Sequence, residues 1–331
     1  MVAGVPSPVL LLIALALAFD FLNGFHDSAN VVATMIASRA LSGRQALTIT
    51  ALAEFAGPFL FGVAIATTIG QEVLVGSGLR LSVVLAALSA SILWNLVTWW
   101  LGIPASSSHA LIGGLIGAAV MEGGWGAVRL AGVGKVALAL ALSPLVGLVA
   151  GYLVMKVVLF LARGASPRIN RLFKRGQIVT AVALALSHGT NDAQKTMGII
   201  TLGLVSAGRL PSFRVPLWVI AVCAAAIALG TASGGWRLIR TLGGRFYQIR
   251  PVHGFAAQVA SAGVILGAAL LGGPVSTTQV VSSAIMGVGS AERLSKVRWG
   301  TGRQIAIAWL TTIPATALLA AGLAAILRRW A

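Results

Sequence analysis

The chain has 331 residues, of which 58% are hydrophobic and only 9% are charged. Soluble domains carry about a quarter charged residues, so the composition excludes a soluble globular protein and predicts a multi-pass membrane protein. The net charge of +17 would also suit a nucleic-acid-binding protein, but Lys and Arg lie mainly between the apolar runs, with clusters at 163–175 and 237–250. The positive-inside rule predicts this pattern for cytoplasmic loops, so we expect no nucleic-acid partner.

The first apolar run begins close to the N-terminus. Residues 1–8 contain no Lys or Arg, so they lack the basic region that opens a cleaved signal peptide. We predict that they start the first membrane segment and lie on the non-cytoplasmic side of the membrane.

Further apolar runs follow along the chain. The first half has a run at 8–38 that polar residues interrupt, runs at 46–69 and 81–101, a short one after Pro104, and one at 133–161. A membrane helix needs roughly 20 apolar residues, so the interrupted and the short runs could be broken helices or re-entrant hairpins. We predict an all-α polytopic membrane protein with about ten membrane-embedded segments, hairpins included.

Two motifs of the first half recur about half the chain length further on, which is a sign of internal repetition. The matching pairs are 23–30 (NGFHDSAN) with 188–195 (HGTNDAQK) and 104–109 (PASSSH) with 274–279 (PVSTTQ). We therefore predict two membrane repeats at 1–162 and 177–331, joined by a basic cytoplasmic loop at 163–176. Duplicated polar motifs within apolar segments are typical of transporters with inverted-topology repeats.

The first motif places an aspartate, Asp27 or Asp192, three residues after a glycine in an apolar run. Charges inside a bilayer cost roughly 2.5–3.5 kcal/mol or more and usually serve transport, proton relay or sensing. Glycine can unwind a helix, so we expect breaks at Gly24 and Gly189, after which new half-helices present amides to an anion. The alternative is that the aspartates only cap helix starts. The other candidate ligands in these motifs are Asn23, His26, Asn30, Asn191 and Gln194.

The second motif joins a proline to three consecutive residues that all carry hydroxyl groups. Proline favours the first turn of a helix, where hydroxyl groups could replace the hydration shell of a tetrahedral oxyanion. Alternatively, these side chains only join membrane helices to one another. The six candidates are Ser106, Ser107, Ser108, Ser276, Thr277 and Thr278.

The two halves differ in one charge, because Lys195 stands where the first half has Asn30. An ammonium group there could neutralise an anionic substrate or pair with Asp27 or Asp192. The alternative is that Lys195 extends toward the membrane surface.

Energy for transport must come from outside the chain, which contains no phosphate-binding loop of the ATPase type. We predict no enzyme activity, no cofactor and no structural metal, and we expect an ion gradient to drive transport. Asp20, Glu54 and His26 are candidate proton carriers. Asp20 and Glu54 lack acidic counterparts in the second half. The alternative for each candidate is that its side chain only makes a hydrogen bond between two helices.

The stretches at 23–34 (NGFHDSANVVAT) and 187–198 (SHGTNDAQKTMG) resemble the two signature motifs of the PiT family of inorganic phosphate transporters. The two hydroxyl-rich motifs fit the same family. The resemblance implies an inverted-repeat secondary carrier that transports phosphate with a cation, and a homodimer. It also implies that Asp27, Asn30, Asp192 and the hydroxyl triplets occupy the substrate and ion site.

The departures from the family pattern bear on the coupling ion. Sodium-coupled members of the family have a motif similar to Asn-Asp-x-x-Asn in both halves. This chain differs in having His26 before Asp27 in the first copy and Lys195 at the last position of the second copy. This pattern is similar to a bacterial low-affinity subgroup thought to use protons and to carry phosphate with a divalent metal. We therefore predict a proton-coupled phosphate importer of the inner (cytoplasmic) membrane. A sodium-coupled phosphate symporter, a sulfate permease of the same fold, and a channel or membrane enzyme are the alternatives.

Overall fold

The computed structural model describes residues 7–75, 80–244 and 246–330, so residues 1–6 of the predicted N-terminal segment lie outside the described part. The first half contains α1 (Ser7–Ala37), α2 (Gly43–Leu60), α3 (Ala64–Glu72), α4 (Leu81–Leu101), α5 (Ser107–Gly123), the short η2 (Trp125–Ala127) and α6 (Leu130–Leu161). The second contains α7 (Ile169–Ser206), α8 (Leu217–Ser233), α9 (Trp236–Gly244), α10 (Pro251–Leu270), α11 (Thr277–Glu292), η3 (Leu294–Lys296) and α12 (Trp299–Trp330). This architecture confirms the predicted all-α class.

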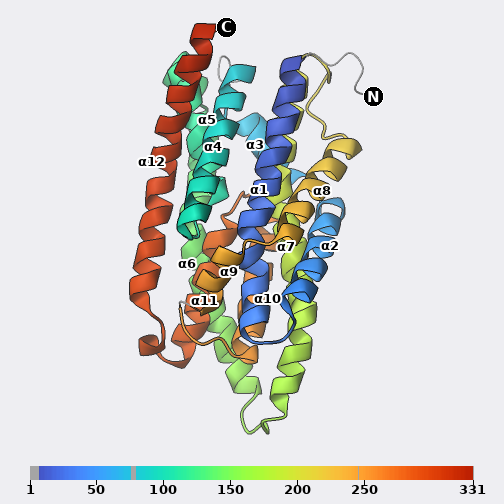
Figure 1. Cartoon of the computed structure of the whole chain (residues 1–331), viewed down its shortest axis with the longest axis vertical. Coiled ribbons are helices and arrows are strands. Elements are labelled where there is room, and N and C mark those ends of the chain that lie inside the picture. Colours follow the sequence, from blue (N-terminus) through green and yellow to red (C-terminus); the bar gives the residue numbers. More distant parts are fainter. Residues whose placement is uncertain (1–6, 76–79, 245, 331) are drawn as a thin grey trace.

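The helices form an elongated bundle (Figure 1), in which α1 begins at the end of the molecule where α12 ends. Among the described residues, five helices, α1, α4, α6, α10 and α12, are long and apolar enough to cross a membrane. The pairs α2–α3 and α8–α9 are each bent by 72° at a short break, and counting each pair as one span gives up to seven. The described chain is therefore a multi-pass membrane protein.

The same succession of helices appears in both halves, and the halves exchange their packing partners. Helix α1 packs on α8 as α7 packs on α2, and α5 packs on α12 as α11 packs on α6. The direction in which each half crosses the membrane stays a prediction. Helix α7 begins at Ile169, so within the basic stretch predicted as a loop only 163–168 lies outside a helix. Because no proline or glycine follows Pro167 until Gly176, and Arg and Lys favour helices, the helix can start this early.

The predicted breaks at Gly24 and Gly189 are wrong, because α1 and α7 are continuous helices. Both glycines serve close packing instead. A Cβ atom on Gly24 would lie 2.1 Å from the carbonyl oxygen of Ile227, and one on Gly189 would lie 2.4 Å from that of Glu54. The observed bends lie elsewhere, between α2 and α3 and between α8 and α9, where Gly62 and Gly234 have φ angles of 79° and 72°.

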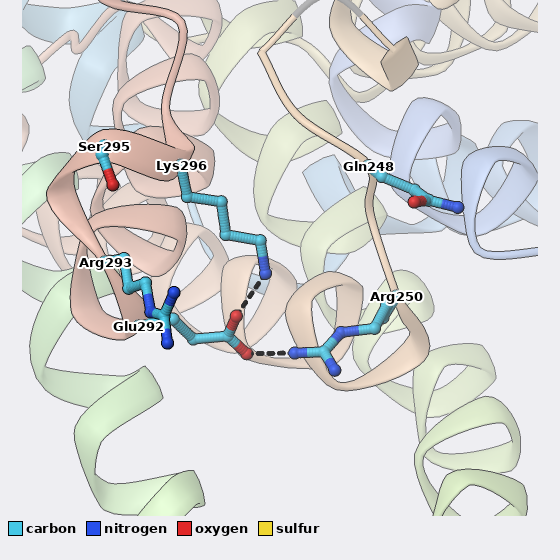
Figure 2. Close-up of a pocket in the computed structure, with 6 residues that line it drawn as sticks. All are labelled: Gln248, Arg250, Glu292, Arg293, Ser295 and Lys296. Carbon is cyan, nitrogen blue, oxygen red and sulfur yellow. Dashed lines mark hydrogen bonds and ion pairs between the residues drawn. The ribbon is translucent and has the colours of Figure 1, made fainter.

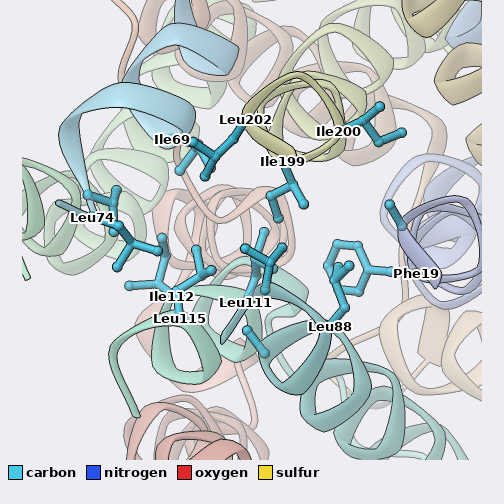
Figure 3. Packing of buried hydrophobic residues seen from close by; sticks show 14 of the residues in the cluster. Phe19, Ile69, Leu74, Leu88, Leu111, Ile112, Leu115, Ile199, Ile200 and Leu202 are labelled. Atoms are coloured by element: carbon cyan, nitrogen blue, oxygen red, sulfur yellow. The ribbon is translucent and has the colours of Figure 1, made fainter. Parts of the chain in front are cut away.

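Two apolar clusters lie one above the other along the bundle. One contains Phe19 of α1 and Ile199 of α7, with side chains of α4 and α5 (Figure 3). The other contains Val32 of α1 and Leu184 of α7, with side chains of α10 and α11. The duplicated motifs of α1 and α7 lie between these clusters, so the fold places them about midway along the bundle.

The outer surface is strongly apolar, as a lipid environment requires. On α12, Leu310 and Leu318 are 77% and 76% exposed, and Leu153 on α6 is 56% exposed. Soluble proteins rarely leave such continuous apolar surface in contact with water.

Candidate functional site

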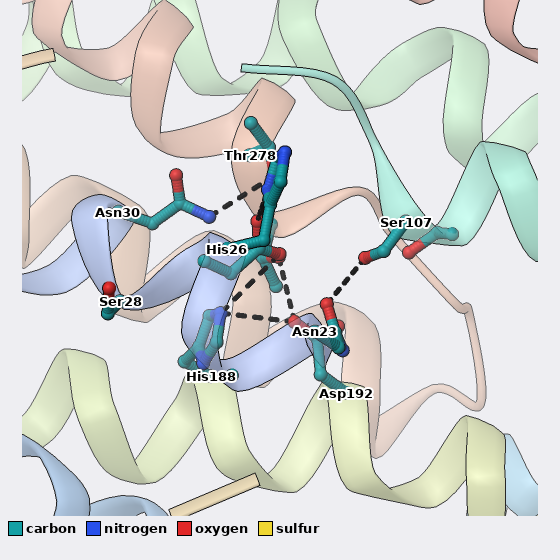
Figure 4. Close-up of polar contacts among 12 residues, drawn as sticks. Asn23, His26, Ser28, Asn30, Ser107, His188, Asp192 and Thr278 are labelled. Atoms are coloured by element: carbon teal, nitrogen blue, oxygen red, sulfur yellow. Dashed lines mark hydrogen bonds and ion pairs between the residues drawn. The ribbon is translucent and has the colours of Figure 1, made fainter. Parts of the chain in front are cut away.

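Helices α5 and α11 begin at the same level as the motifs of α1 and α7. Gly102 and Gly272 take the left-handed conformation, with φ angles of 69° and 68°, and so redirect the chain after α4 and α10. The next helices start at Ser106 and Ser276, whose hydroxyl oxygens accept hydrogen bonds from the backbone N–H of His109 and Gln279. Four helices therefore surround one polar cluster (Figure 4).

Asp27 lies in this cluster and is 1% exposed. Its Oδ1 accepts a hydrogen bond from Thr278 at 3.0 Å and lies 3.0 Å from His26 Nδ1. The amide of Asn30 donates to the same threonine at 3.2 Å. The first motif and the start of α11 are thus joined directly.

Asp192 pairs with Lys195 of the same helix, and both side chains are almost fully buried. The Lys195 ammonium also donates to Ser108 Oγ at 2.7 Å and to the Val275 carbonyl at 3.2 Å. An ammonium group has three protons, so each has an acceptor. Lys195 therefore contacts Asp192, one of its two predicted partners, and it lies inside the bundle rather than toward the membrane surface.

Thr277 stands between the two aspartates. Its hydroxyl lies 2.9 Å from Asp192 Oδ2 and 3.3 Å from Asp27 Oδ2. A hydroxyl has a single proton, so it can donate to only one of these oxygens at a time. The other oxygen needs a further proton or a cation.

The remaining hydroxyl groups join the two helix starts to each other and to α1. Ser276 donates to Ser106 at 2.8 Å, and Ser107 donates to Asn23 Oδ1 at 2.6 Å. The first turns of α5 and α11 also carry free amides and a partial positive charge. The free amides that we expected after Gly24 and Gly189 are therefore found at the starts of α5 and α11 instead.

His188 is a central residue that sequence reasoning left out of the site. Its Nε2 lies 3.1 Å from Asp192 Oδ2 and 3.9 Å from Asp27 Oδ2, while its Nδ1 lies 2.9 Å from Glu54 Oε1. These are ion-pair distances, although the N–H directions are not those of hydrogen bonds. The spacing of four residues to Asp192 would have shown that both lie on one helix face, had the helix been expected to continue through Gly189.

Glu54 belongs to the same cluster through His188, and it contacts the Thr231 hydroxyl. That hydroxyl also lies 3.1 Å from the Gly24 carbonyl oxygen. Because Thr231 has one proton for two acceptors, a proton on Glu54 would satisfy both contacts. A line of titratable side chains thus runs from Glu54 through His188 to the aspartates.

Three predicted residues make no hydrogen bond or ion pair with this cluster within the described residues. Gln194 accepts hydrogen bonds from the backbone N–H groups of Ile65 and Ala66, so it caps the start of α3. Asn191 is buried, but its side chain makes no hydrogen bond within the described residues. Asp20 is also buried, and it faces Thr196 and Cys223 without hydrogen bonds of normal geometry.

The cluster also offers a ligand set for a metal ion. Asp27, His188 and Asp192 each contribute one atom, and these atoms lie within 4.8 Å of one another. Imidazole and carboxylate groups are ligands that divalent metals accept. The same residues can therefore hold a proton, a monovalent cation or a divalent metal.

Comparisons with known proteins agree with this architecture. Residues 23–320 match the model of the phosphate transporter family. A probable low-affinity inorganic phosphate transporter of Bacillus subtilis is 44% identical over 316 residues, which cover 94% of this chain and 95% of the relative. A protein of the same description from Rhizobium meliloti is 44% identical over 312 residues, which cover 94% and 93% of the two chains.

A solved structure described as the sodium-dependent phosphate transporter has a similar fold. Its TM-score is 0.88 at 24% identity, with 98% of this chain and 99% of that chain covered. The family resemblance predicted from the motifs is confirmed, and so is the prediction of a transporter rather than an enzyme. The chain belongs to the phosphate transporter family.

Proposed function

We propose that this protein is a secondary carrier that imports inorganic phosphate together with protons. The buried cluster around Asp27 and Asp192 is the transport site, and it is exposed to the two sides of the membrane in turn. The observation that supports this proposal best is the line of titratable side chains from Glu54 through His188 to the two aspartates, next to the starts of α5 and α11.

Charge balance favours a coupling ion. Lys195 neutralises one aspartate, whereas the other aspartate and an incoming phosphate both add negative charge. Buried charges are costly unless they are paired. Protons on His188 and on a carboxyl group would supply the missing positive charge without a further ligand sphere.

Protons rather than sodium ions are favoured by Lys195. Its ammonium already occupies the position that Asn30 holds in the first half, and it bonds to Ser108 as Asn30 bonds to Thr278. An oxygen ligand available to a sodium ion is thereby replaced by a positive charge. Sodium dependence, which is named for the structural neighbour, is the alternative that the experiment must exclude.

Phosphate is favoured over sulfate by the acceptors in the cluster. Phosphate at neutral pH carries at least one proton, which a carboxylate such as Asp27 can accept in a hydrogen bond. Sulfate carries none, so the same carboxylate would repel it. A sulfate permease is therefore the weaker alternative.

The cargo can include a divalent metal. The ligand atoms of Asp27, His188 and Asp192 are close enough to hold one, and a metal phosphate would need fewer protons for charge balance. Uptake that depends on added Mg²⁺ and stops with a chelator would support this form of the cargo.

We also propose that the protein is a homodimer in the cytoplasmic membrane, with the loop at 163–168 inside the cell. The single cysteine, Cys223, is buried. A Ser166→Cys variant would therefore carry one reactive thiol. Labelling of this thiol in inverted vesicles but not in intact cells would support the orientation, and the opposite pattern would refute it. Cross-linking through the same thiol is a test for dimers.

The central experiment is uptake of labelled phosphate into proteoliposomes. We expect uptake that follows an inward proton gradient, stops with a protonophore, and is equal in sodium and potassium media. Sulfate in excess should compete poorly. Uptake that requires sodium and ignores the protonophore would overturn the proposed coupling, and equal competition by sulfate would overturn the substrate.

The site itself is tested by Asp27→Asn and Asp192→Asn. Each variant keeps the shape of the side chain and removes a charge that holds Thr277, Thr278 or Lys195. We expect each to abolish net uptake while the protein still reaches the membrane. Normal transport by either variant would show that the transport site lies elsewhere.

A further inference from the structure

An open pocket of about 620 Å³ lies where α11 ends and α10 begins. It is at the end of the molecule that also carries the loop between α6 and α7 (Figure 1), far from the start of α11 in the buried site. The residues that line it are Gln248, Arg250, Glu292, Arg293, Ser295 and Lys296 (Figure 2).

Positive charge exceeds negative charge in this pocket. Glu292 pairs with Arg250 and Lys296, and His253 Nε2 lies 2.9 Å from the same carboxylate. His253 Nδ1 accepts a hydrogen bond from the backbone N–H of Arg250, so the ring proton lies on Nε2 and the neutral ring can donate to Glu292. Burial raises the pKa of Glu292, but hydrogen bonds from Lys296 and His253 and the neighbouring charges lower it to about 2. The pocket lining therefore contains one carboxylate, Glu292, and three cations, Arg250, Arg293 and Lys296.

The first half shows what the ion pair alone requires. Arg80 at the start of α4 pairs with Glu122 near the end of α5, as Arg250 pairs with Glu292. This matching pair lies at the opposite end of the bundle (Figure 1). In the sequence, Gly123, Trp125 and Gly126 stand at the places of Arg293, Ser295 and Lys296. A single arginine and a single glutamate thus suffice to tie the two helices together.

Arg293 and Lys296 are therefore additional to this structural role. Within the described residues, the Arg293 side chain has no ion pair or hydrogen bond, and it is exposed. Gathering like charges around an open pocket is unfavourable unless an anion binds there. A guanidinium group binds phosphate oxygens in pairs and an ammonium group adds a further charge.

We propose that this pocket is a second, separate phosphate-binding site, which holds either free inorganic phosphate or the phosphate of an anionic lipid headgroup. Arg293 and Lys296 bind the anion, with Arg250 beside them. Gln248 and Ser295 are further hydrogen-bond donors at the pocket wall.

The test uses the full-length protein in phosphatidylcholine nanodiscs and labelled inorganic phosphate in equilibrium dialysis. We expect two phosphates per chain in the native protein. The variant Arg293→Ala/Lys296→Ala should bind one phosphate as the native protein does. It should bind the second phosphate at least tenfold more weakly. The control Arg171→Ala/Lys174→Ala removes two exposed cations from the start of α7 at the same end of the molecule and should leave both sites intact.

A second arm distinguishes the lipid from free phosphate. If a lipid headgroup occupies the pocket, native mass spectrometry after reconstitution with phosphatidylglycerol should find a lipid bound to the native protein. The control variant should keep this lipid, and the double variant should lose it. The single variant Arg293→Ala gives the same readouts without disturbing Glu292, should the double variant fold poorly. The proposal is overturned if these variants bind phosphate and retain the lipid as the native protein does. It is also overturned if the control variant loses as much phosphate or lipid binding as they do. If the proposed phosphate import were refuted, this test of the second site would still stand, because it measures binding and not transport.

Discussion

Replacement of Lys195 by asparagine tests the role of the buried ammonium group. The variant restores the residue found at the equivalent position of the first half, Asn30. It removes the partner of Asp192 and two further hydrogen bonds, to Ser108 and to the Val275 carbonyl. Because all of these groups are buried, no water replaces the lost positive charge directly.

The magnitude follows from the pair that is broken. Removing one partner of a buried ion pair costs roughly 3–5 kcal/mol, and each 1.4 kcal/mol is about tenfold in a binding constant. The asparagine amide recovers part of this cost through Ser108. We therefore expect the KM for phosphate in sodium-free medium to rise by roughly 10- to 100-fold.

Sodium provides the decisive comparison. With asparagine in place of the lysine, Asp192 and the new amide oxygen form a vacant cation position, so sodium should restore part of the affinity of the variant. Uptake into proteoliposomes is measured in choline and in sodium media, with Lys174→Asn at the exposed start of α7 as the matched control. An unchanged KM in both media would refute the view that Lys195 serves the transport site.

Three further predictions address packing, proton transfer and the Glu292 cluster. Gly24→Ala should lower the free energy of unfolding of the detergent-solubilised protein by roughly 1–3 kcal/mol, because the new methyl group overpacks against Ile227. The control Gly263→Ala, whose Cβ meets nothing within 4 Å, should not lower it. Equal melting curves for the two variants would contradict this packing. Glu54→Gln should change the pH dependence of uptake, and an unaltered profile would exclude Glu54 from the proton path. Glu292 has its pKa lowered from 4.5 to about 2, so its stabilising effect is full above about pH 4.5 and declines as the pH falls toward 2. The stability difference between native protein and Glu292→Gln should therefore shrink as the pH falls from about 4.5 toward 2, and an unchanged difference over that range would contradict the ion cluster.

The meeting of the duplicated motifs could be predicted from the sequence because repeats that share a fold tend to bring equivalent segments together. Asp27 and Asp192 contact the same Thr277 hydroxyl, and Ser106 bonds to its counterpart Ser276. Each of these residues is recognisable from its own short motif. No long-range information is needed beyond the repetition itself.

The predictions that failed depend on contacts between distant segments. The role of Gly24 is set by a carbonyl group of α8, and that of Gly189 by one of α2, neither of which is visible in the local sequence. Gln194 belongs to a motif of site residues, yet it caps α3 because that helix starts beside it. His188 was missed because its position relative to Asp192 depends on α7 continuing through the glycine.

The two halves share one geometry and differ in charge, and this difference bears directly on the mechanism. Asn30 bonds to Thr278 and Lys195 bonds to Ser108 at equivalent places, so the scaffold tolerates either side chain. A fixed ammonium group supplies positive charge in every state of the transport cycle and cannot be released with the cargo. The charge that changes between states must then reside on groups that exchange protons or bind ions, and around the aspartates these include His188, Glu54 and His26. Exchange of His188 for glutamine should accordingly separate the two functions: phosphate binding persists through Lys195 and the helix starts, while uptake no longer responds to the proton gradient. Uptake by this variant that remains fully sensitive to a protonophore would show that the proton takes another path.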